Sequence, residues 1–118
     1  SGEQYYEHLD KMIVSIKQKN PQTAVLVMTS PASILHRKYT NTFIEDYSAK
    51  IKEKSIEKQY AVWDLLYILG GNKAIYRNAA KGYMARDKVH YSKAGYEKQA
   101  ELFFEAFVQS YELFKSTK

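Results

Sequence analysis

The sequence contains no cysteine and no long run of apolar residues. Without cysteine there is no disulfide scaffold, no thiol nucleophile and no thiolate-bound zinc, and the chain suits a reducing or an oxidising compartment equally. No apolar run is longer than that of residues 24–28, which has the length of a strand. It is far too short for a helix that crosses a bilayer, so we expect no membrane span.

What the sequence does contain is typical of one small folded domain. Its 118 residues are 45% hydrophobic and 14% aromatic, which is enough for a packed core and excludes a disordered chain. The formal charge of +5 would attract polyanions. The lysines, however, are scattered among glutamates and apolar residues, a pattern of solvated helix faces, so we expect no nucleic-acid partner.

Apolar periodicity divides the chain into helices and strands. The predicted elements are a helix over residues 3–19, a strand over 24–28, a helix from 40–42 to about 58, a strand over 60–64, an irregular stretch from Gly70 to Gly82, and a final helix capped by Ser92. Ser1 with Gln4, and Thr42 with Glu45, have the spacing of capping boxes. The second helix has a predicted buried stripe of Phe43, Tyr47, Ile51 and Ile56, and the final helix has an apolar face of Tyr96, Ala100, Phe103, Phe107, Tyr111 and Phe114.

Two strands separated by a helix predict an α/β fold with a parallel sheet. The continuously apolar residues 24–28 are typical of a central strand that is buried on both faces. Two strands alone would leave open edges and uncovered faces. We therefore expect residues 1–118 to be the C-terminal part of a single doubly wound domain, with the remainder N-terminal to them.

Asp87 and His90 are candidates for acid–base chemistry. Both lie in the loop before the final helix, and ligand sites of open α/β sheets gather at the carboxyl ends of the strands. An aspartate three residues before a histidine can fold back to accept the Nδ1 proton, which leaves Nε2 free to take a proton from a hydroxyl. Taken alone, the spacing of Asp87 and His90 fits a structural histidine, which caps a helix or packs in the core, as well as it fits a catalytic one. His8 and His36 add no zinc-ligand spacing.

The residues after Asp87 carry a resemblance to a known family. The run from Asp87 to Ala100, DKVHYSKAGYEKQA, closely resembles the last conserved block of the SGNH (GDSL-type) esterases, which has Asp-x-x-His, an aromatic residue, a small polar residue and then Gly-Tyr before a helix. The strand that leads into Thr29-Ser30-Pro31 resembles the family strand before a proline-containing loop. AVWDL at residues 61–65, followed by Gly70-Gly71, resembles a bacterial subgroup.

The resemblance implies a three-layer, flavodoxin-like fold, with His90 as catalytic base and Asp87 as the carboxylate that orients it. The nucleophilic serine of the family has no counterpart here, because no serine of this chain stands in a Gly-Asp-Ser-like turn. The oxyanion-hole glycine and asparagine are missing too, since Asn72 and Asn78 come too late in the chain. A histidine–aspartate pair with no nucleophile and no oxyanion donors has nothing to activate, so we expect the isolated chain to be inactive.

For the complete protein the resemblance implies a carboxylic ester hydrolase that needs neither metal nor organic cofactor. The implied substrate is an acyl ester, with acetyl groups on carbohydrate as the expected case, and a periplasmic or secreted bacterial location is favoured. The alternatives are a non-catalytic module that folds with a partner chain, and a small basic nucleic-acid-binding domain. The lack of a coherent basic face argues against the second alternative.

Other residues have less specific interpretations. Trp63 is expected in the core rather than in a sugar-stacking platform, and Asp64 is expected to cap the following helical turn. The family analogy places Ser30 and Pro31 at the border of the active-site cleft. The remaining candidates for substrate contact, named only for their nearness to the histidine loop, are Arg77, Asn78 and Arg86.

Overall fold

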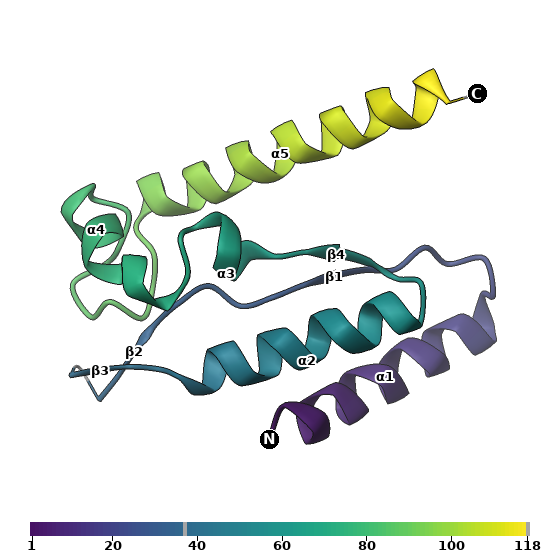
Figure 1. Ribbon diagram of the computed structural model, residues 1–118, viewed down its shortest axis with the longest axis horizontal. Coiled ribbons are helices and arrows are strands. Elements are labelled where there is room, and N and C mark those ends of the chain that lie inside the picture. Colours follow the sequence, from purple (N-terminus) through teal and green to yellow (C-terminus); the bar gives the residue numbers. More distant parts are fainter. Residues whose placement is uncertain (37, 118) are drawn as a thin grey trace.

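The computed structural model describes residues 1–36 and 38–117 as an α/β fold in three layers (Figure 1). Strand β1 (Leu26–Met28) pairs in parallel with β4 (Ala61–Trp63) to form the middle layer. Helices α1 (Gly2–Lys19) and α2 (Phe43–Glu57) lie on one side of these strands, and α5 (Lys93–Ser116) lies on the other. The predicted α/β class with a parallel sheet is confirmed.

Most of the short elements between the main ones were not predicted. An antiparallel pair, β2 (Ile34–Leu35) and β3 (Tyr39–Thr40), follows β1. Helix α3 (Leu65–Ile68) is the helical turn expected after Asp64. The stretch predicted to be irregular, from Gly70 to Gly82, contains the 3-10 helix η1 (Asn72–Ala74) and α4 (Ile75–Ala80). Elements of two to six residues are too short for an apolar period to become visible in the sequence.

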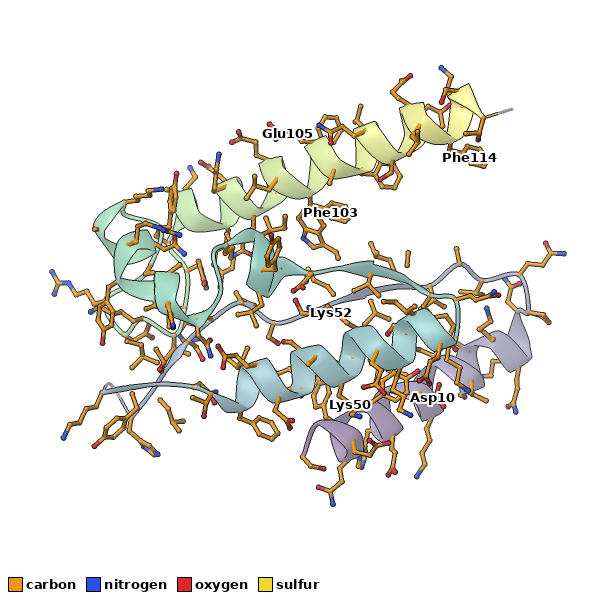
Figure 2. The ribbon with its side chains drawn as sticks, viewed as in Figure 1. Asp10, Lys50, Lys52, Phe103, Glu105 and Phe114 are labelled. Atoms are coloured by element: carbon orange, nitrogen blue, oxygen red, sulfur yellow. The ribbon has the colours of Figure 1, made fainter. Side chains whose placement is uncertain are left out.

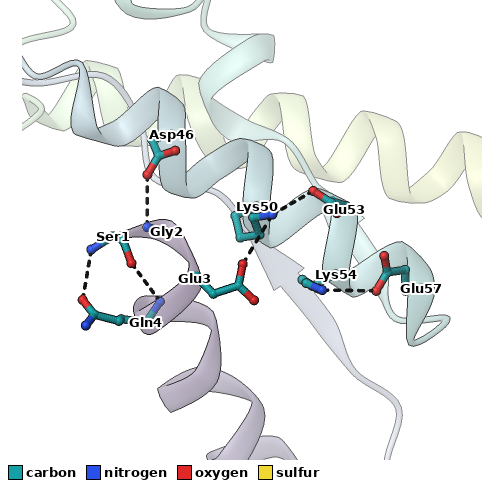
Figure 3. A network of polar contacts seen from close by, with 9 residues as sticks. All are labelled: Ser1, Gly2, Glu3, Gln4, Asp46, Lys50, Glu53, Lys54 and Glu57. Carbon is teal, nitrogen blue, oxygen red and sulfur yellow. Dashed lines mark hydrogen bonds and ion pairs between the residues drawn. The ribbon is translucent and has the colours of Figure 1, made fainter.

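Helices α1 and α2 pack closely through their N-terminal halves. Gly2 is buried, and a Cβ at this position would lie 2.9 Å from the Cα of Tyr47, so a side chain there would force the helices apart. Figure 3 shows the polar contacts at this junction, where the Gly2 amide donates to Asp46 and Lys50 pairs with Glu3 and Glu53. The capping box predicted at Ser1 and Gln4 is confirmed, which fixes the start of α1 at Gly2.

The capping prediction for α2 is wrong. Thr42 has helical dihedral angles and its side chain makes no capping hydrogen bond, because backbone carbonyls of Asn41 and Thr42 already accept from the first free amides. The predicted buried stripe is half right: Ile51 is buried and Tyr47 packs partly buried against the core, whereas Phe43 and Ile56 are exposed. The buried residues of α2 are Ile44, Ser48, Ile51 and Ser55. The two serines were missed because a small hydroxyl side chain does not register as apolar, although it lets a helix approach its neighbours closely.

The hydrophobic core lies mainly on the α1–α2 side of the sheet. Val27 of β1 is buried there against Ile13 and Ile51. The prediction that this strand is buried on both faces is wrong for the described chain, because Leu26 and Met28 are 51% and 58% exposed. The uncovered face of β1 points to the α5 side.

Helix α5 contacts the sheet at few points. Phe103 points from α5 toward the strands and packs edge-on against Trp63, with 5.6 Å between ring centroids (Figure 2). This contact and the half-buried position of Trp63 confirm the expectation that Trp63 belongs to the core. The predicted apolar face of α5 is otherwise largely open, and Tyr96, Phe107 and Tyr111 are all more than half exposed.

No helix among the described residues combines the length and the apolar character that crossing a membrane requires.

Candidate active site

The candidate residues lie at the tip of a loop between α4 and α5. Its two sides are joined by an antiparallel bridge between Met84 and Tyr91, with hydrogen bonds from Ala85 to the His90 carbonyl and from Ser92 to the Tyr83 carbonyl. Ser92 then caps α5 by accepting from the Gly95 amide, as the sequence predicted. The loop therefore ends in a rigid helix, and Asp87 and His90 lie within it.

Asp87 and His90 form a hydrogen-bonded pair. Asp87 Oδ2 lies 2.7 Å from His90 Nδ1, and Asp87 Oδ1 accepts from the amides of Val89 and His90 at 2.9 and 3.0 Å. The hydrogen bond from the His90 ring, followed by the two amide hydrogen bonds, holds the pKa of Asp87 well below its ordinary value. An ionised carboxylate can only accept, so Nδ1 donates to Asp87, and the tautomer that this hydrogen bond favours has its lone pair at Nε2.

The ring of His90 faces solvent. Its side chain is 72% exposed, compared with 38% for Asp87. No hydrogen bond joins Nε2 to a serine hydroxyl anywhere in the described part of the chain. Ser48 and Ser55 are buried in α2, and Ser92 is engaged at the start of α5. Among the described residues, the ring of His90 is therefore held through Nδ1 alone, and its Nε2 side faces solvent.

Tyr91 fixes the position of this loop. Its side chain is buried, and its hydroxyl donates to the carbonyl of Ala32 at 3.1 Å. Burial, followed by the nearby Tyr96, raises the pKa of Tyr91 to about 12, so the hydroxyl remains a donor at neutral pH. The Ile34 amide adds a second link by donating to the Lys88 carbonyl at 3.1 Å. Both links join the histidine loop to the segment that follows the carboxyl end of β1.

A second polar cluster lies where β1 and β4 end. Thr29 Oγ1 donates to Asp64 Oδ1 at 3.0 Å and accepts from the Leu66 amide, and Lys52 of α2 lies 2.7 Å from Asp64 Oδ2. Asp64 also accepts from the Tyr67 amide, which confirms the prediction that it caps the next helical turn. These contacts give Asp64 a structural role.

A surface pocket of about 280 Å³ adjoins the pair. It is lined by Ile34, Arg86, Asp87 and Lys88. Lys88 has a φ of 53°, which a lysine adopts at a cost of about 1 kcal/mol and which was not visible in the sequence. The lining thus combines two cationic side chains, Arg86 and Lys88, with the carboxylate of Asp87.

The other named candidates take different roles. Arg86 lines the pocket, whereas Asn78 is buried and donates to the Leu69 carbonyl at 2.9 Å, which makes it structural. His8 contacts the Gln4 carbonyl within α1. Sequence reasoning missed the anchoring role of Tyr91, although the aromatic residue after the histidine was a visible signal. No group of three or more histidine, aspartate or glutamate side chains among residues 1–36 and 38–117 is placed to hold a metal.

Comparison with known proteins shows a structural likeness to a solved esterase. No family model matches the sequence, and no curated protein matches it either. The fold is similar to part of a solved peptidoglycan O-acetylesterase, with a TM-score of 0.82 over 92% of this chain and a sequence identity of 17%. The match covers 32% of that protein, so the chain spans about a third of its length. The described chain thus has the α/β fold of one portion of a known esterase.

Proposed function

We propose that this chain is the histidine- and aspartate-bearing part of a serine esterase of the SGNH (GDSL-type) kind. The observation that carries the proposal is the pair itself, an exposed His90 whose Nδ1 lies 2.7 Å from the ionised Asp87. Its place beside the carboxyl end of a parallel strand is where α/β folds bind ligands. The likeness to an esterase fold supports the same reaction class.

In the proposed reaction, His90 takes the proton of a serine hydroxyl through Nε2 while the oxygen attacks the ester carbonyl. The resulting imidazolium is stabilised by Asp87 and then protonates the departing alcohol. A water molecule, deprotonated by His90 in turn, attacks the acyl carbon. The bond from this carbon to the serine oxygen then breaks, His90 returns the proton to that oxygen, and the acid is released. The serine and the oxyanion donors come from a polypeptide segment outside the described residues, because none of these residues places a hydroxyl at Nε2.

The proposed substrate is an acyl ester of carbohydrate, with acetyl as the acyl group. The solved relative is a peptidoglycan O-acetylesterase, which supports this class and an extracytoplasmic location. Arg86 and Lys88 border the pocket beside His90 and would favour a glycan that carries carboxylates. The mechanism draws on side chains alone and needs no metal or organic cofactor.

The test measures hydrolysis of p-nitrophenyl acetate. The purified 118-residue chain is expected to show no turnover above background. In the protein that includes the serine-bearing segment, His90→Ala and Asp87→Asn are each expected to lower kcat by about 10³- to 10⁴-fold, because the base or its orientation is lost. His8→Ala is the matched control, since its ring contacts only the Gln4 carbonyl of α1.

Either of two results contradicts the proposal. One is turnover by the isolated chain that His90→Ala abolishes, which would mean that the nucleophile lies within these residues. The other is an active complete protein that is unaffected by His90→Ala. The second result would favour the alternative function, a non-catalytic module that folds with a partner, for which the exposed apolar surface is the supporting observation.

A further inference from the structure

A basic pocket of about 310 Å³ lies where α3, α4 and the first half of α5 meet, at the end of the molecule where α5 begins (Figure 1). Three cationic side chains line it, those of Arg77, Lys81 and Lys98, and no aspartate or glutamate of the described residues does so. It shares no lining residue with the pocket beside His90. Its volume falls at the lower end of the range of small-molecule sites.

Two of the three cations of the basic pocket have no counter-ion. Lys98 pairs with Glu101 at 3.4 Å within α5, whereas Arg77 and Lys81 form no ion pair within the described part of the chain. The Lys98 side chain is 35% exposed, so it is partly sheltered from water. Uncompensated positive charge around one concave space raises the local concentration of anions. The pocket therefore suits an anionic ligand.

Gly70 makes room for the guanidinium of Arg77. A Cβ on Gly70 would lie 2.5 Å from Nη2 of Arg77, so the guanidinium occupies the space that a side chain would need. Gly70 also has a φ of 100°, in the left-handed region that favours glycine. The guanidinium thus lies against bare backbone at the wall of the basic pocket. Its planar fork of N–H donors matches two oxygens of a single carboxylate or phosphate.

The walls of the basic pocket are fixed to the core. The buried Asn78 side chain donates to the Leu69 carbonyl at 2.9 Å, and the Tyr83 amide donates to the Asn78 carbonyl at 2.9 Å. Leu69 belongs to the core, and Leu102 of α5 packs partly buried against the same cluster. Leu69, Tyr83 and Leu102 also line the pocket, so apolar surface and a phenol ring adjoin the cations. A site held in this way needs little ordering when a ligand binds.

We propose that the basic pocket binds a small phosphomonoester, with the phosphate on Arg77, Lys81 and Lys98 and the carbon-bearing part of the ligand against the apolar wall. A phosphomonoester carries a charge of about −1.5 to −2 at neutral pH, which matches the two uncompensated cations, whereas a carboxylate matches one. The cations surround one pocket and do not extend along a stripe, so the site holds a single phosphate and not the backbone of a nucleic acid. This binding site goes beyond the proposed function, because it uses neither Asp87 nor His90.

The experiment is a calorimetric titration of the 118-residue chain with glucose 6-phosphate at low ionic strength. We expect one site per chain, for which inorganic phosphate competes. Glucose should not bind, and glucuronate, which carries one carboxylate, should bind about 10-fold or more weakly than glucose 6-phosphate. Arg77→Gln and Lys81→Gln should each lower the affinity about 10-fold or more, because each removes a charge-assisted hydrogen bond. Lys11→Gln is the matched control, since it removes the same charge from an exposed position of α1, on the other side of the sheet. Circular dichroism melts show that each variant folds.

Three other results would overturn the proposal. One is no binding of glucose 6-phosphate, or binding that Arg77→Gln and Lys81→Gln leave unchanged. Another is glucuronate that binds as tightly as glucose 6-phosphate, which would assign the basic pocket to carboxylates. The third is a single-stranded oligonucleotide that binds more tightly than glucose 6-phosphate and displaces it, which would assign the pocket to nucleic acid. None of these results bears on ester hydrolysis, so the binding site and the proposed function stand or fail separately.

Discussion

In the histidine loop, Tyr91 anchors the backbone and its neighbour His90 faces solvent. The Tyr91 ring is buried and its hydroxyl reaches the Ala32 carbonyl, whereas the His90 ring is 72% exposed. Because neighbouring side chains on an extended backbone point to opposite sides, anchoring Tyr91 turns His90 outward. The backbone of the loop is thereby held in place while the imidazole stays accessible, as the proposed proton transfer requires.

Gly95 is predicted to be essential for the position of this loop. A Cβ there would collide with the carbonyl oxygen of Tyr83, which already accepts from the Ser92 amide. Alanine favours a helix over glycine by about 1 kcal/mol, but forcing backbone apart costs about 2–3 kcal/mol, the upper part of the usual range for overpacking. We expect Gly95→Ala to lower the free energy of unfolding by about 1–2 kcal/mol in urea titrations. Lys93→Ala, exposed on the same helix, should change it by less than about 0.5 kcal/mol. An unchanged or raised stability in Gly95→Ala would contradict the clash.

The pairing of Asp87 with His90 was predictable, because three residues of loop allow a short-range contact. Tyr91 was visible in the sequence as an aromatic residue, yet its hydrogen bond to a carbonyl 59 residues away depends on how β1 and the loop meet in space. The left-handed conformation of Lys88 had no signal at all, since such positions are usually marked by glycine or asparagine.

At the scale of helices and strands, Asp64 connects three elements at the carboxyl end of the sheet. It follows β4, accepts from Thr29 after β1, and pairs with Lys52, which points from α2 toward the strands (Figure 2). Burial raises the pKa of Asp64, but the hydrogen bonds from Lys52, Tyr67 and Thr29 outweigh it, so the net shift lowers the pKa. The carboxylate therefore stabilises the fold in its ionised form.

Asp64→Asn is predicted to alter the acid stability of the protein. Because the folded pKa of Asp64 is lowered, its contribution is fully present above the unfolded value of about 3.9 and is lost as the pH falls through the folded pKa. We expect the variant to be less stable by about 1–2 kcal/mol at pH 7, a value reduced by the partial exposure of Lys52. In thermal melts, the difference in stability between the variant and the unaltered protein should become smaller below about pH 4. Glu105→Gln, which points away from the sheet on α5, is the control (Figure 2), and a difference that does not vary with pH would contradict the assignment.

The long elements were predictable and their packing faces were less so. The helices and the two parallel strands follow from periodicity, but the stripe of α2 is built on Ile44, Ser48, Ile51 and Ser55. Its register is set by contact with α1 and β4 rather than by hydrophobicity alone. The β2–β3 pair consists of two-residue strands held by local hydrogen bonds and carries no pattern of its own.

On the scale of the whole molecule, the described residues form three layers, and the middle layer has two strands. The sequence predicted this shortfall, because two strands cannot cover their own edges and faces. It did not predict which strand would be left with an uncovered edge and face. The exposed side chains of Leu26 and Met28 show that this strand is β1, which Figure 1 shows between α5 and the α1–α2 pair.

The uncovered faces of β1 and α5 have a calorimetric consequence. The heat capacity of unfolding grows with the apolar surface that unfolding exposes, and a compact chain of this length should show about 1.4–1.8 kcal/mol/K. The folded chain exposes 8462 Å², about 1,900 Å² more than the roughly 6,600 Å² of a compact monomer of 13.7 kDa. We expect scanning calorimetry of the isolated chain to give a heat capacity of unfolding that is lower by about 0.3–0.8 kcal/mol/K. With this lower heat capacity, the free energy of unfolding should vary unusually little with temperature. A heat capacity of unfolding as large as that of a compact chain would show that α5 closes onto the sheet in solution.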